Sequence, residues 1–298
     1  MKLSARRYPM NKGGSQPPAE KIRHGLTLIN TAKKLSITDS VNPCKSVSEI
    51  KVRPAISVFF PCYNEQGNVA RTVERALEFL EKLNADFEVI IIDDGSTDST
   101  GHIADEITRR NNRVKVVHHH PNLGYGAALR SGFKAATKEL VFYTDGDGQF
   151  DIRELPPLLP LMDEADIVSC YRLNRQDNLI RKINGWCWTK LVCFLFGMKV
   201  RDIDCAFKLY KREIFDHIEL SSTGALINAE ILARAVRLGY RLTERGVHHY
   251  PRTAGKQTGA NPCVILRAFK ELIKLYSKIK KGSPKQTQIA DPEGIGGE

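Results

Sequence analysis

Long apolar runs are missing from this 298-residue sequence. The longest uninterrupted ones, such as Leu191–Phe196, are far shorter than the roughly 18 to 20 residues that a helix needs to cross a bilayer. No apolar segment of the secretory type follows Met1, so we expect a cytoplasmic protein. A chain of this length can nevertheless bury a full core, in one large or two modest domains.

Paired cysteines are missing as well. The chain has seven cysteines, an odd number, and no C-x-x-C pair. This pattern excludes the usual zinc sites and disulfide frameworks. Cys62, Cys170, Cys193 and Cys205 lie in apolar surroundings, which predicts unreactive thiols in the core.

Excess charge is absent from the middle of the chain, although the formal net charge is +11. Residues 54–266 carry 27 charges of each sign, whereas residues 1–53 carry 11 basic against 3 acidic residues and residues 267–281 carry 6 against 1. A neutral body argues against a specific nucleic-acid groove, and basic flanks suit an anionic membrane surface. Their composition predicts a mostly disordered arm over 1–53 and a disordered tail over 282–298.

Between the flanks, short apolar runs alternate with segments of helical periodicity. Strands are expected at Ile56–Phe60, Phe87–Ile92, Val114–His118 and Leu140–Tyr143, and helices over 68–83, 100–111 and 125–137. The alternation predicts an α/β fold with a mostly parallel sheet flanked by helices. Ligands of such sheets bind at the carboxyl ends of the strands.

The most informative segment is Asp145-Gly146-Asp147-Gly148, which directly follows an apolar run. Side chains at i and i+2 of an extended chain share a face, so the two carboxylates can point the same way. Mg²⁺ or Mn²⁺ binds through one or two carboxylates and completes its shell with water and phosphate oxygens. Aspartate and glycine also form ordinary solvated turns, so the segment alone fits a turn as well as a metal site.

Two further polar clusters are expected at the same edge of the sheet. Residues 61–65 read Pro-Cys-Tyr-Asn-Glu, and residues 93–98 read Asp-Asp-Gly-Ser-Thr-Asp. A carboxylate at the end of the second strand can bind ribose hydroxyls or a base N–H. Asp94 or Ser96 could also cap the following helix, with Asp98 in its first turn.

A dinucleotide-binding loop is the competing interpretation of Gly124-Tyr125-Gly126. These residues follow a strand, open a helix, and have Asp145 about 20 residues further on. Leu129 stands where the motif needs its third glycine. We therefore expect Asn122–Gly126 to form a tight turn close to a nucleotide.

Together these segments resemble family 2 glycosyltransferases of the GT-A fold, especially the dolichol- and polyprenol-phosphate mannosyl- and glucosyltransferases. The matching pieces run in family order: Pro61–Glu65, Asp93–Asp98, Asn122–Gly124, Asp145–Gln149 and Tyr171–Arg172. The resemblance implies a GT-A domain over 54–261, with a nucleotide-binding half over 54–150 and an acceptor half over 151–261.

The resemblance also implies roles for single residues. Those that would hold the nucleotide are Pro61, Tyr63, Glu65, Asp93 and Asp94, with Asn122 and Gly124 beside them. Those that would hold the metal and the diphosphate are Asp145, Asp147 and Gln149. Arg172 and Arg181 would face the acceptor phosphate or the donor diphosphate, as guanidinium groups suit. A solvated surface position is the alternative for both arginines.

Later segments resemble the family more loosely. Residues 201–210 are similar to its acceptor-side segment. Residues 248–256 are similar to a late loop that can close on the diphosphate, which assigns Arg252 and Lys256 to that group. The family's Gly-x-Ser-Lys is replaced here by Gly-Lys-Gln-Thr from Gly255 onward. His248 and His249 could add a metal ligand, although such a pair is more often structural.

The implied reaction moves a hexose from a GDP- or UDP-sugar to a polyprenyl or dolichyl phosphate in a single displacement with inversion. Mg²⁺ or Mn²⁺ would neutralise the leaving nucleoside diphosphate. An ionised lipid phosphate needs no general base, whereas a saccharide hydroxyl does. Glu230 or Asp204 would then be the base, although for Glu230 we expect a solvent-facing position on its helix.

Two segments suit a peripheral membrane location. Residues 262–281 form a basic amphipathic pattern, and Leu179–Val200 carries the interfacial aromatics Trp186 and Trp188. Both could instead pack on the sheet. A separate membrane protein is a further conceivable partner, because the chain has no spanning segment to handle a lipid product.

Two other function classes stay open. A sugar nucleotidylyltransferase would show a glycine-rich phosphate loop after the first strand, where residues 61–65 stand instead. A noncatalytic adaptor that binds a nucleotide-sugar or a membrane would not need Asp145 and Asp147, so their presence argues against it.

Overall fold

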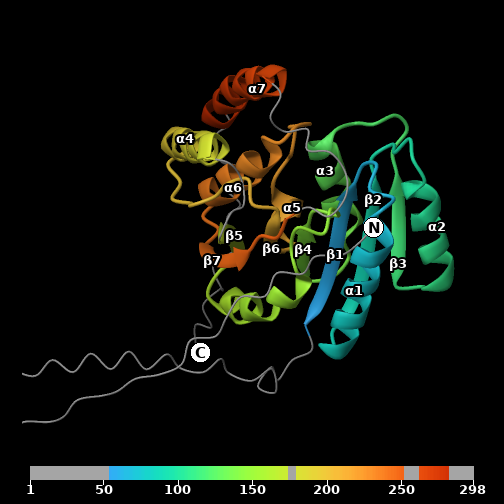
Figure 1. The fold of residues 1–298 in the computed structure, drawn as a ribbon. Coiled ribbons are helices and arrows are strands. Elements are labelled where there is room, and N and C mark those ends of the chain that lie inside the picture. The colour runs from blue at the N-terminus through green and yellow to red at the C-terminus, as the bar shows by residue number, and fades with distance from the viewer. Residues whose placement is uncertain (1–53, 174–178, 252–261, 282–298) are drawn as a thin grey trace, which may run out of the picture. The chain divides into compact units, whose positions relative to one another are not determined.

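The computed structural model (Figure 1) gives the backbone of three stretches of the chain, residues 54–173, 179–251 and 262–281. Side chains are described in all of them except at 179–181, 262–268 and 281. The predicted arm over 1–53 and the predicted tail over 282–298 lie outside the described residues.

Strands and helices alternate along the described chain as the periodicity predicts. The strands are β1 (Ala55–Cys62), β2 (Asp86–Asp93), β3 (Val114–His118), β4 (Leu140–Thr144), β5 (Ile167–Leu173), β6 (Phe207–Lys211) and β7 (Leu242–His248). The helices are α1 (Val69–Lys82), α2 (Thr100–Arg110), α3 (Tyr125–Ala135), η2 (Ile152–Glu154), η3 (Pro156–Asp163), α4 (Leu179–Phe196), α5 (Ile214–His217), α6 (Ile227–Arg237) and α7 (Pro262–Lys281). All seven elements expected between residues 56 and 143 are present.

The seven strands form one sheet in the order β3-β2-β1-β4-β6-β5-β7. β6 runs antiparallel to β4 and β5, and the other neighbouring pairs are parallel. The predicted mostly parallel α/β sheet is confirmed. β1 continues two residues beyond the predicted Phe60, because Pro61 and Cys62 still pair with Ile92 and Asp93 of β2.

One face of the sheet is covered by α1, α2 and the η3 helix. Val69, Val73, Ala76 and Leu80 recur at helical spacing along α1 and are buried against this face. Leu158 of η3 joins the same apolar cluster. This layer fixes the start of α1 beside the carboxyl end of β1.

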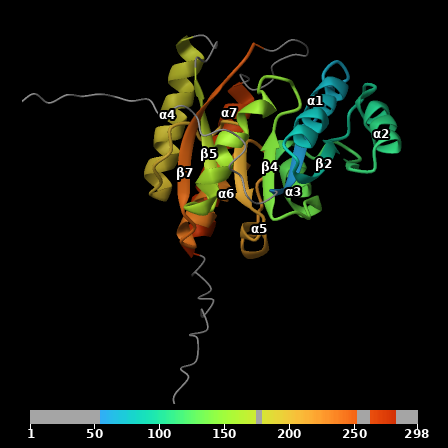
Figure 2. The ribbon, with the colours of Figure 1, turned by 90° about the horizontal axis from the view of Figure 1, so that it is seen from below.

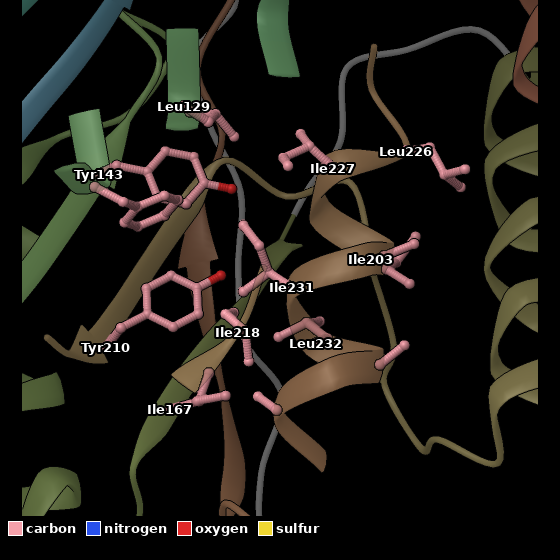
Figure 3. Close-up of a cluster of buried hydrophobic side chains, with 14 of the residues drawn as sticks. Leu129, Tyr143, Ile167, Ile203, Tyr210, Ile218, Leu226, Ile227, Ile231 and Leu232 are labelled. Atoms are coloured by element: carbon pink, nitrogen blue, oxygen red, sulfur yellow. The ribbon is translucent and has the colours of Figure 1, made fainter. Parts of the chain in front are cut away.

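The other face is covered by α3 and α6, together with parts of α4 and α7 (Figures 1 and 3). Tyr143 and Tyr210 lie side by side on the sheet, with ring centroids 6.3 Å apart, and face the apolar side chains of α6. Phe133 of α3 packs edge-on against both tyrosine rings. The sheet is thus buried on both faces, as parallel sheets require.

Helices α4 and α7 pack against each other along the outer side of this layer (Figures 1 and 2). The Trp188 and Phe269 rings meet edge to face at 5.5 Å, and the Phe196 and Tyr276 rings lie 6.0 Å apart. Both contacts advance in the same direction along the two helices, so α4 and α7 run parallel. Within the aromatic segment Leu179–Val200, α4 ends at Phe196, because Gly197 takes a positive φ of 67° that terminates the helix.

The predicted core position of four cysteines is confirmed, since Cys62, Cys170, Cys193 and Cys205 are all buried. Burial raises the pKa of Cys205 to about 12, so its thiol stays protonated at neutral pH. In the part of the chain that the structure describes, no helix is long and apolar enough to cross a membrane.

Candidate active site

The three polar clusters predicted to share an edge of the sheet do so. β1, β2 and β4 are parallel neighbours, with Cys62 beside Asp93 and Phe59 beside Tyr143. The carboxyl ends of the three strands therefore meet, and the loops after them extend from one edge. The turn before α3 joins them through contacts with the loop after β2.

The loops after β1 and β2 are locked together by Asn64. Its backbone N–H donates to Ser96 Oγ at 3.0 Å, and its side-chain oxygen accepts from the Thr97 N–H at 2.8 Å. Asn64 has a positive φ of 56°, which asparagine tolerates better than most residues. Next to this junction, 48% of the Tyr63 surface is exposed. Tyr63 thus presents an open ring at the edge where a nucleotide base is predicted.

Two other residues predicted to bind the nucleotide, Pro61 and Glu65, contact other parts of the protein. Pro61 lies in β1 and is buried. Glu65 is half-buried, and its Oε2 accepts from Asn68 Nδ2 at 2.6 Å. Its backbone N–H donates to Thr100 Oγ1 at 2.8 Å, which ties the first loop to the start of α2.

Asp93 is buried and forms a pair with His118. Its carboxylate accepts from the Ser96 N–H at 3.1 Å and lies 2.9 Å from His118 Nδ1. The other ring nitrogen of His118 lies 3.1 Å from Asp105 Oδ1. Burial alone would raise the pKa of Asp93, but the bonds from Ser96 and His118 outweigh burial and lower it below its ordinary value.

Asp94 shapes the tight turn that was predicted around Asn122. Its carboxylate accepts from the N–H groups of Leu123 and Gly124, at 3.0 and 2.9 Å, and its backbone oxygen accepts from Asn122 Nδ2 at 2.7 Å. His119 Nδ1 lies 2.6 Å from the same carboxylate. The predicted turn is thus present, and Asp94 holds it. The binding of ribose by Asp93 and Asp94 stays a prediction.

Capping of α2 falls to Asp98 rather than to Asp94. Asp98 Oδ1 accepts from the backbone N–H of Thr100, the first residue of α2, at 2.9 Å. Ser96 serves the loop junction instead. Asp94 and Ser96, the two predicted caps, are thus engaged elsewhere, and Asp98, predicted in the first turn, lies just before α2 and supports its start from there.

The two aspartates after β4 differ in their surroundings. Asp145 is half-buried and accepts a hydrogen bond from the Tyr125 hydroxyl at 3.1 Å. Asp147 is buried, and its Oδ1 accepts from the Gln149 N–H at 3.0 Å. Gly148 between them and the next strand takes a positive φ of 74°, which the turn requires.

Negative charge gathers at this edge in a way that suits a divalent cation. Burial, followed by the charges of Glu65, Asp93, Asp145 and Asp147, raises the pKa of the Cys62 thiol above its ordinary value. Among the described residues, no group of three or more His, Cys, Asp and Glu side chains could hold a metal alone. A cation here would therefore rest on the two loop aspartates and on ligand oxygens, as Mg²⁺ or Mn²⁺ does beside a diphosphate.

Gln149 connects this loop with the segment after β7. Its side-chain nitrogen donates to the Tyr250 backbone oxygen at 3.1 Å, and the Tyr250 N–H donates back to the Gln149 backbone oxygen at 2.9 Å. The chain continues from there into residues 252–261, so the predicted diphosphate ligands Arg252 and Lys256 lie outside the described residues. Nearby, His248 Nδ1 lies 3.2 Å from Glu154 Oε2.

Arg172 and the other predicted acceptor-side residues occupy the end of β5 and the loop before β6. Arg172 donates to both oxygens of Asp202, and only 14% of its side chain is exposed. Asp204 is half-buried in the same loop. The side chain of Arg181, at the start of α4, is outside the description. The roles of these residues at a phosphate stay predictions.

Glu230 departs from the sequence-based expectation. It was expected to face solvent on its helix, but its exposed fraction is 0%. Seven other residues of the eleven in α6 are buried too, because the helix is covered by the sheet on one side and approached by α4 and α7 on the other. The expectation of a solvated Glu230 is therefore wrong.

Sequence reasoning missed three polar side chains at this edge. His118, His119 and Tyr125 each bond one of the predicted site aspartates. The run of histidines after the third strand was a usable signal, since polar residues at strand ends line the site in such folds. Tyr125 carries no such signal in the sequence beyond its place between Gly124 and Gly126.

The fold is similar to that of glucosyl-3-phosphoglycerate synthase from Mycobacterium tuberculosis. Its complex with phosphoglyceric acid aligns with a TM-score of 0.59 and 19% sequence identity, over 80% of this chain and 85% of that one. The complex with Mn²⁺, UDP and glucosyl-3-phosphoglycerate gives 0.58 and 18% over the same shares. The complex with Mg²⁺ and UDP gives 0.60 and 16%, over 79% and 85%. At these identities the likeness concerns the fold alone.

The sequence itself carries a family signature. The family described as "Glycosyl transferase family 2" matches residues 57–219, which is more than half of the 298 residues. The match spans all three strand-end clusters and the loop that carries Asp202. The chain therefore belongs to glycosyltransferase family 2, and it has the GT-A-like α/β fold expected from its sequence.

Proposed function

We propose that this glycosyltransferase moves a hexose from a UDP- or GDP-sugar to a polyprenyl or dolichyl phosphate, with inversion, at the cytoplasmic face of a membrane. The observation that carries the metal-dependent transfer is the gathering of Asp145 and Asp147 at the carboxyl edge of the sheet, beside the exposed ring of Tyr63. The glucosyl-3-phosphoglycerate synthase of similar fold has been crystallised with UDP and Mn²⁺ or Mg²⁺.

The donor side of the proposal uses the acidic edge. Asp145 and Asp147 would hold Mg²⁺ or Mn²⁺, with Gln149 next to them, and Tyr63 offers a flat surface on which a base can stack. The bound cation would supply positive charge to the nucleoside diphosphate as it leaves. Arg252 and Lys256 are proposed to add to that charge.

The acceptor side favours a nucleophile that is already ionised. A hydroxyl acceptor needs a carboxylate base within reach, and Glu230 is fully buried with four hydrogen bonds to its oxygens. A phosphate oxygen needs no such base. Arg172 and Arg181 are proposed to attract this phosphate. Asp204, half-buried before β6, is the remaining base for a saccharide hydroxyl, which is the alternative acceptor.

A membrane surface is proposed because α4 and α7 expose apolar side chains among lysines. The exposed residues of this α4–α7 surface are Ile183, Trp186, Phe194, Phe269 and Ile273, with Lys182, Lys190, Lys270, Lys274 and Lys278. Phe194 is 85% and Ile273 69% exposed, which is unusual for large apolar side chains. Apolar groups among lysines are typical of helices that lie in the headgroup layer of an anionic membrane.

The decisive experiment supplies Mn²⁺ and a panel of UDP- and GDP-sugars to the purified protein, with three acceptors in parallel. These are a short polyprenyl phosphate, phosphoglycerate and a free saccharide. We expect nucleoside diphosphate release and lipid-linked sugar with the first acceptor only, and loss of both in Asp147→Ala. Transfer to phosphoglycerate or to the saccharide would show that the acceptor is not a lipid phosphate. If no donor released its nucleoside diphosphate, the proposed activity would be contradicted.

A further inference from the structure

The Glu230 carboxylate is fully buried at the start of α6, and its hydrogen bonds lead away from the helix. Oε2 accepts from the backbone N–H groups of Ser221 and Ser222 at 3.0 and 2.7 Å. Oε1 accepts from Ser221 Oγ at 3.0 Å and from Arg234 Nε at 2.9 Å. Burial works to raise the pKa of Glu230, but these bonds outweigh it and lower the pKa. The carboxylate is thus ionised and anchors the loop over 221–224.

That loop in turn packs on the first residues of α3. The Thr223 backbone oxygen accepts from the Gly126 N–H at 2.8 Å. A Cβ at Gly126 would lie 2.6 Å from the Ser222 backbone oxygen, and a Cβ at Gly124 would lie 2.8 Å from the Thr223 oxygen. Glycine at both positions allows the two backbones to touch. The loop over 221–224 therefore fixes the position of the first residues of α3.

Tyr125 stands between these two glycines and reaches the metal-binding edge. Its hydroxyl donates to Asp145 Oδ1 at 3.1 Å. Asn228, two residues before Glu230 on α6, bonds the Tyr143 hydroxyl, which Figure 3 shows on the side of that helix. Tyr143 lies in β4, and Asp145 directly follows that strand. The first turns of α6 are thus linked to Asp145 indirectly, through Tyr143 and through the loop that packs beside Tyr125.

We propose that Glu230 is a positioning residue for the donor site rather than the general base of the reaction. It fixes the loop over 221–224 against α3, so that Tyr125 keeps Asp145 aimed at the cation and the diphosphate. The proposal rests on the metal-dependent function proposed above. It gives a role to a fully buried carboxylate whose hydrogen bonds lead to the loop that contacts α3.

Glu88 offers a matched control at the opposite edge of the sheet. It is a buried carboxylate that accepts from Ser57 Oγ at 2.6 Å, from the Thr137 N–H at 2.7 Å and from Lys115 Nζ at 2.7 Å. Glu88 thus has the same kinds of partner as Glu230, namely a serine hydroxyl, a backbone N–H and a basic side chain. Thr137 precedes β4, whereas Asp145 follows it. Glu88→Gln therefore imposes the same chemical loss far from the site.

The test compares Glu230→Gln with Glu88→Gln by Mn²⁺ binding in electron paramagnetic resonance, with UDP or GDP present, and by thermal unfolding. We expect both variants to unfold at lower temperature than the wild type. Only Glu230→Gln should weaken Mn²⁺ binding by tenfold or more, while Glu88→Gln stays within twofold. If Glu230→Gln does not fold, Gly126→Ala disturbs the same contact with Glu230 intact, and it should weaken Mn²⁺ binding as well.

Several results would overturn the proposal. If a folded Glu230→Gln variant or Gly126→Ala bound Mn²⁺ as tightly as the wild type, Glu230 would only stabilise the fold. Intact Mn²⁺ and nucleotide binding with loss of kcat for a hydroxyl acceptor alone would make it the general base. Failure of the wild type to bind Mn²⁺ at all would instead overturn the proposed metal-dependent function, so the two failures are distinguishable.

Discussion

Arg172 holds Asp202 through two parallel hydrogen bonds, from Nε at 2.7 Å and from Nη2 at 2.8 Å. The pair joins the end of β5 to the loop before β6, and both side chains are largely buried. Burial works to lower the pKa of Arg172, but the carboxylate of Asp202 outweighs it and raises the pKa above its ordinary value. The arginine is charged at every accessible pH.

Removing one partner of this pair should be costly. Asp202→Asn leaves the buried guanidinium without its counter-charge, and we expect the free energy of unfolding to fall by about 3 kcal/mol. The double variant Arg172→Met with Asp202→Leu should regain much of that loss, because it removes both charges together. Urea unfolding of the three proteins checks this. Regained stability without regained transfer would support a role for Arg172 at a phosphate, and full activity of the double variant would contradict it.

The acidic edge should respond to the loss of either loop aspartate. Asp145→Asn and Asp147→Asn keep the side-chain volume and remove a negative charge, so we expect kcat of the transferase to fall by about 100-fold or more and the Mn²⁺ requirement to rise. Asp163→Asn makes the same change at an exposed position at the end of η3 and should leave both quantities unchanged. If all three variants had the same kcat and Mn²⁺ requirement, the two aspartates would not be part of the active site.

The His118–Asp93 pair should make stability depend on pH. Burial works to lower the pKa of His118, but its bonds to Asp93 and Asp105 outweigh burial and raise it above 6.5. The stabilisation from a raised pKa is complete below the unfolded value and is lost as the pH rises through the folded value. Asp93, with its lowered pKa, stays ionised throughout that window.

We therefore expect the wild type to lose unfolding free energy as the pH rises above the ordinary histidine value of 6.5, more steeply than His118→Asn does. Urea unfolding at several pH values measures the two slopes. His102→Asn, on the exposed side of α2, serves as the control because it removes a histidine that is 69% exposed. Parallel pH profiles for the wild type and His118→Asn would show that the pair does not couple folding to protonation.

The α4–α7 surface should be needed for membrane binding. Trp186→Glu with Ile273→Glu places two charges among exposed apolar side chains, so it should abolish flotation with anionic liposomes while leaving unfolding unchanged. Leu238→Glu alters a 40% exposed residue at the end of α6 and should float as the wild type does. Failure of the wild type to float with the liposomes would contradict the membrane proposal. Flotation of the double variant would show that another surface binds the membrane.

The sequence predicts the part of this fold from β1 to β4 better than the rest. Apolar runs and helical spacing located each strand and helix from β1 to β4, and the strand-end rule brought their polar clusters to one edge. Those signals are local, or follow from parallel strand order. The position of β6 between β4 and β5 has no local signal, because it depends on pairing with strands at distant sequence positions.

The individual side chains show the same limit. The partners of Asp94 lie 25 to 30 residues further along the chain, and Asp202 lies 30 residues beyond Arg172. The burial of Glu230 depends on helices that approach α6 from both sides of it in sequence. Residue type therefore indicated which groups gather at the site, and the fold decided which of them bond each other and which face a ligand.

The place of β6 also has a consequence for synthesis of the protein. β4 pairs with β1 on one side and with β6 on the other, and β6 ends at Lys211. While the ribosome is still adding the residues before β6, the first four strands can assemble with β4 as an open edge, a site where chains can pair wrongly. Slow translation of residues 145–211 would prolong that exposure, which ends when β6 pairs with β4.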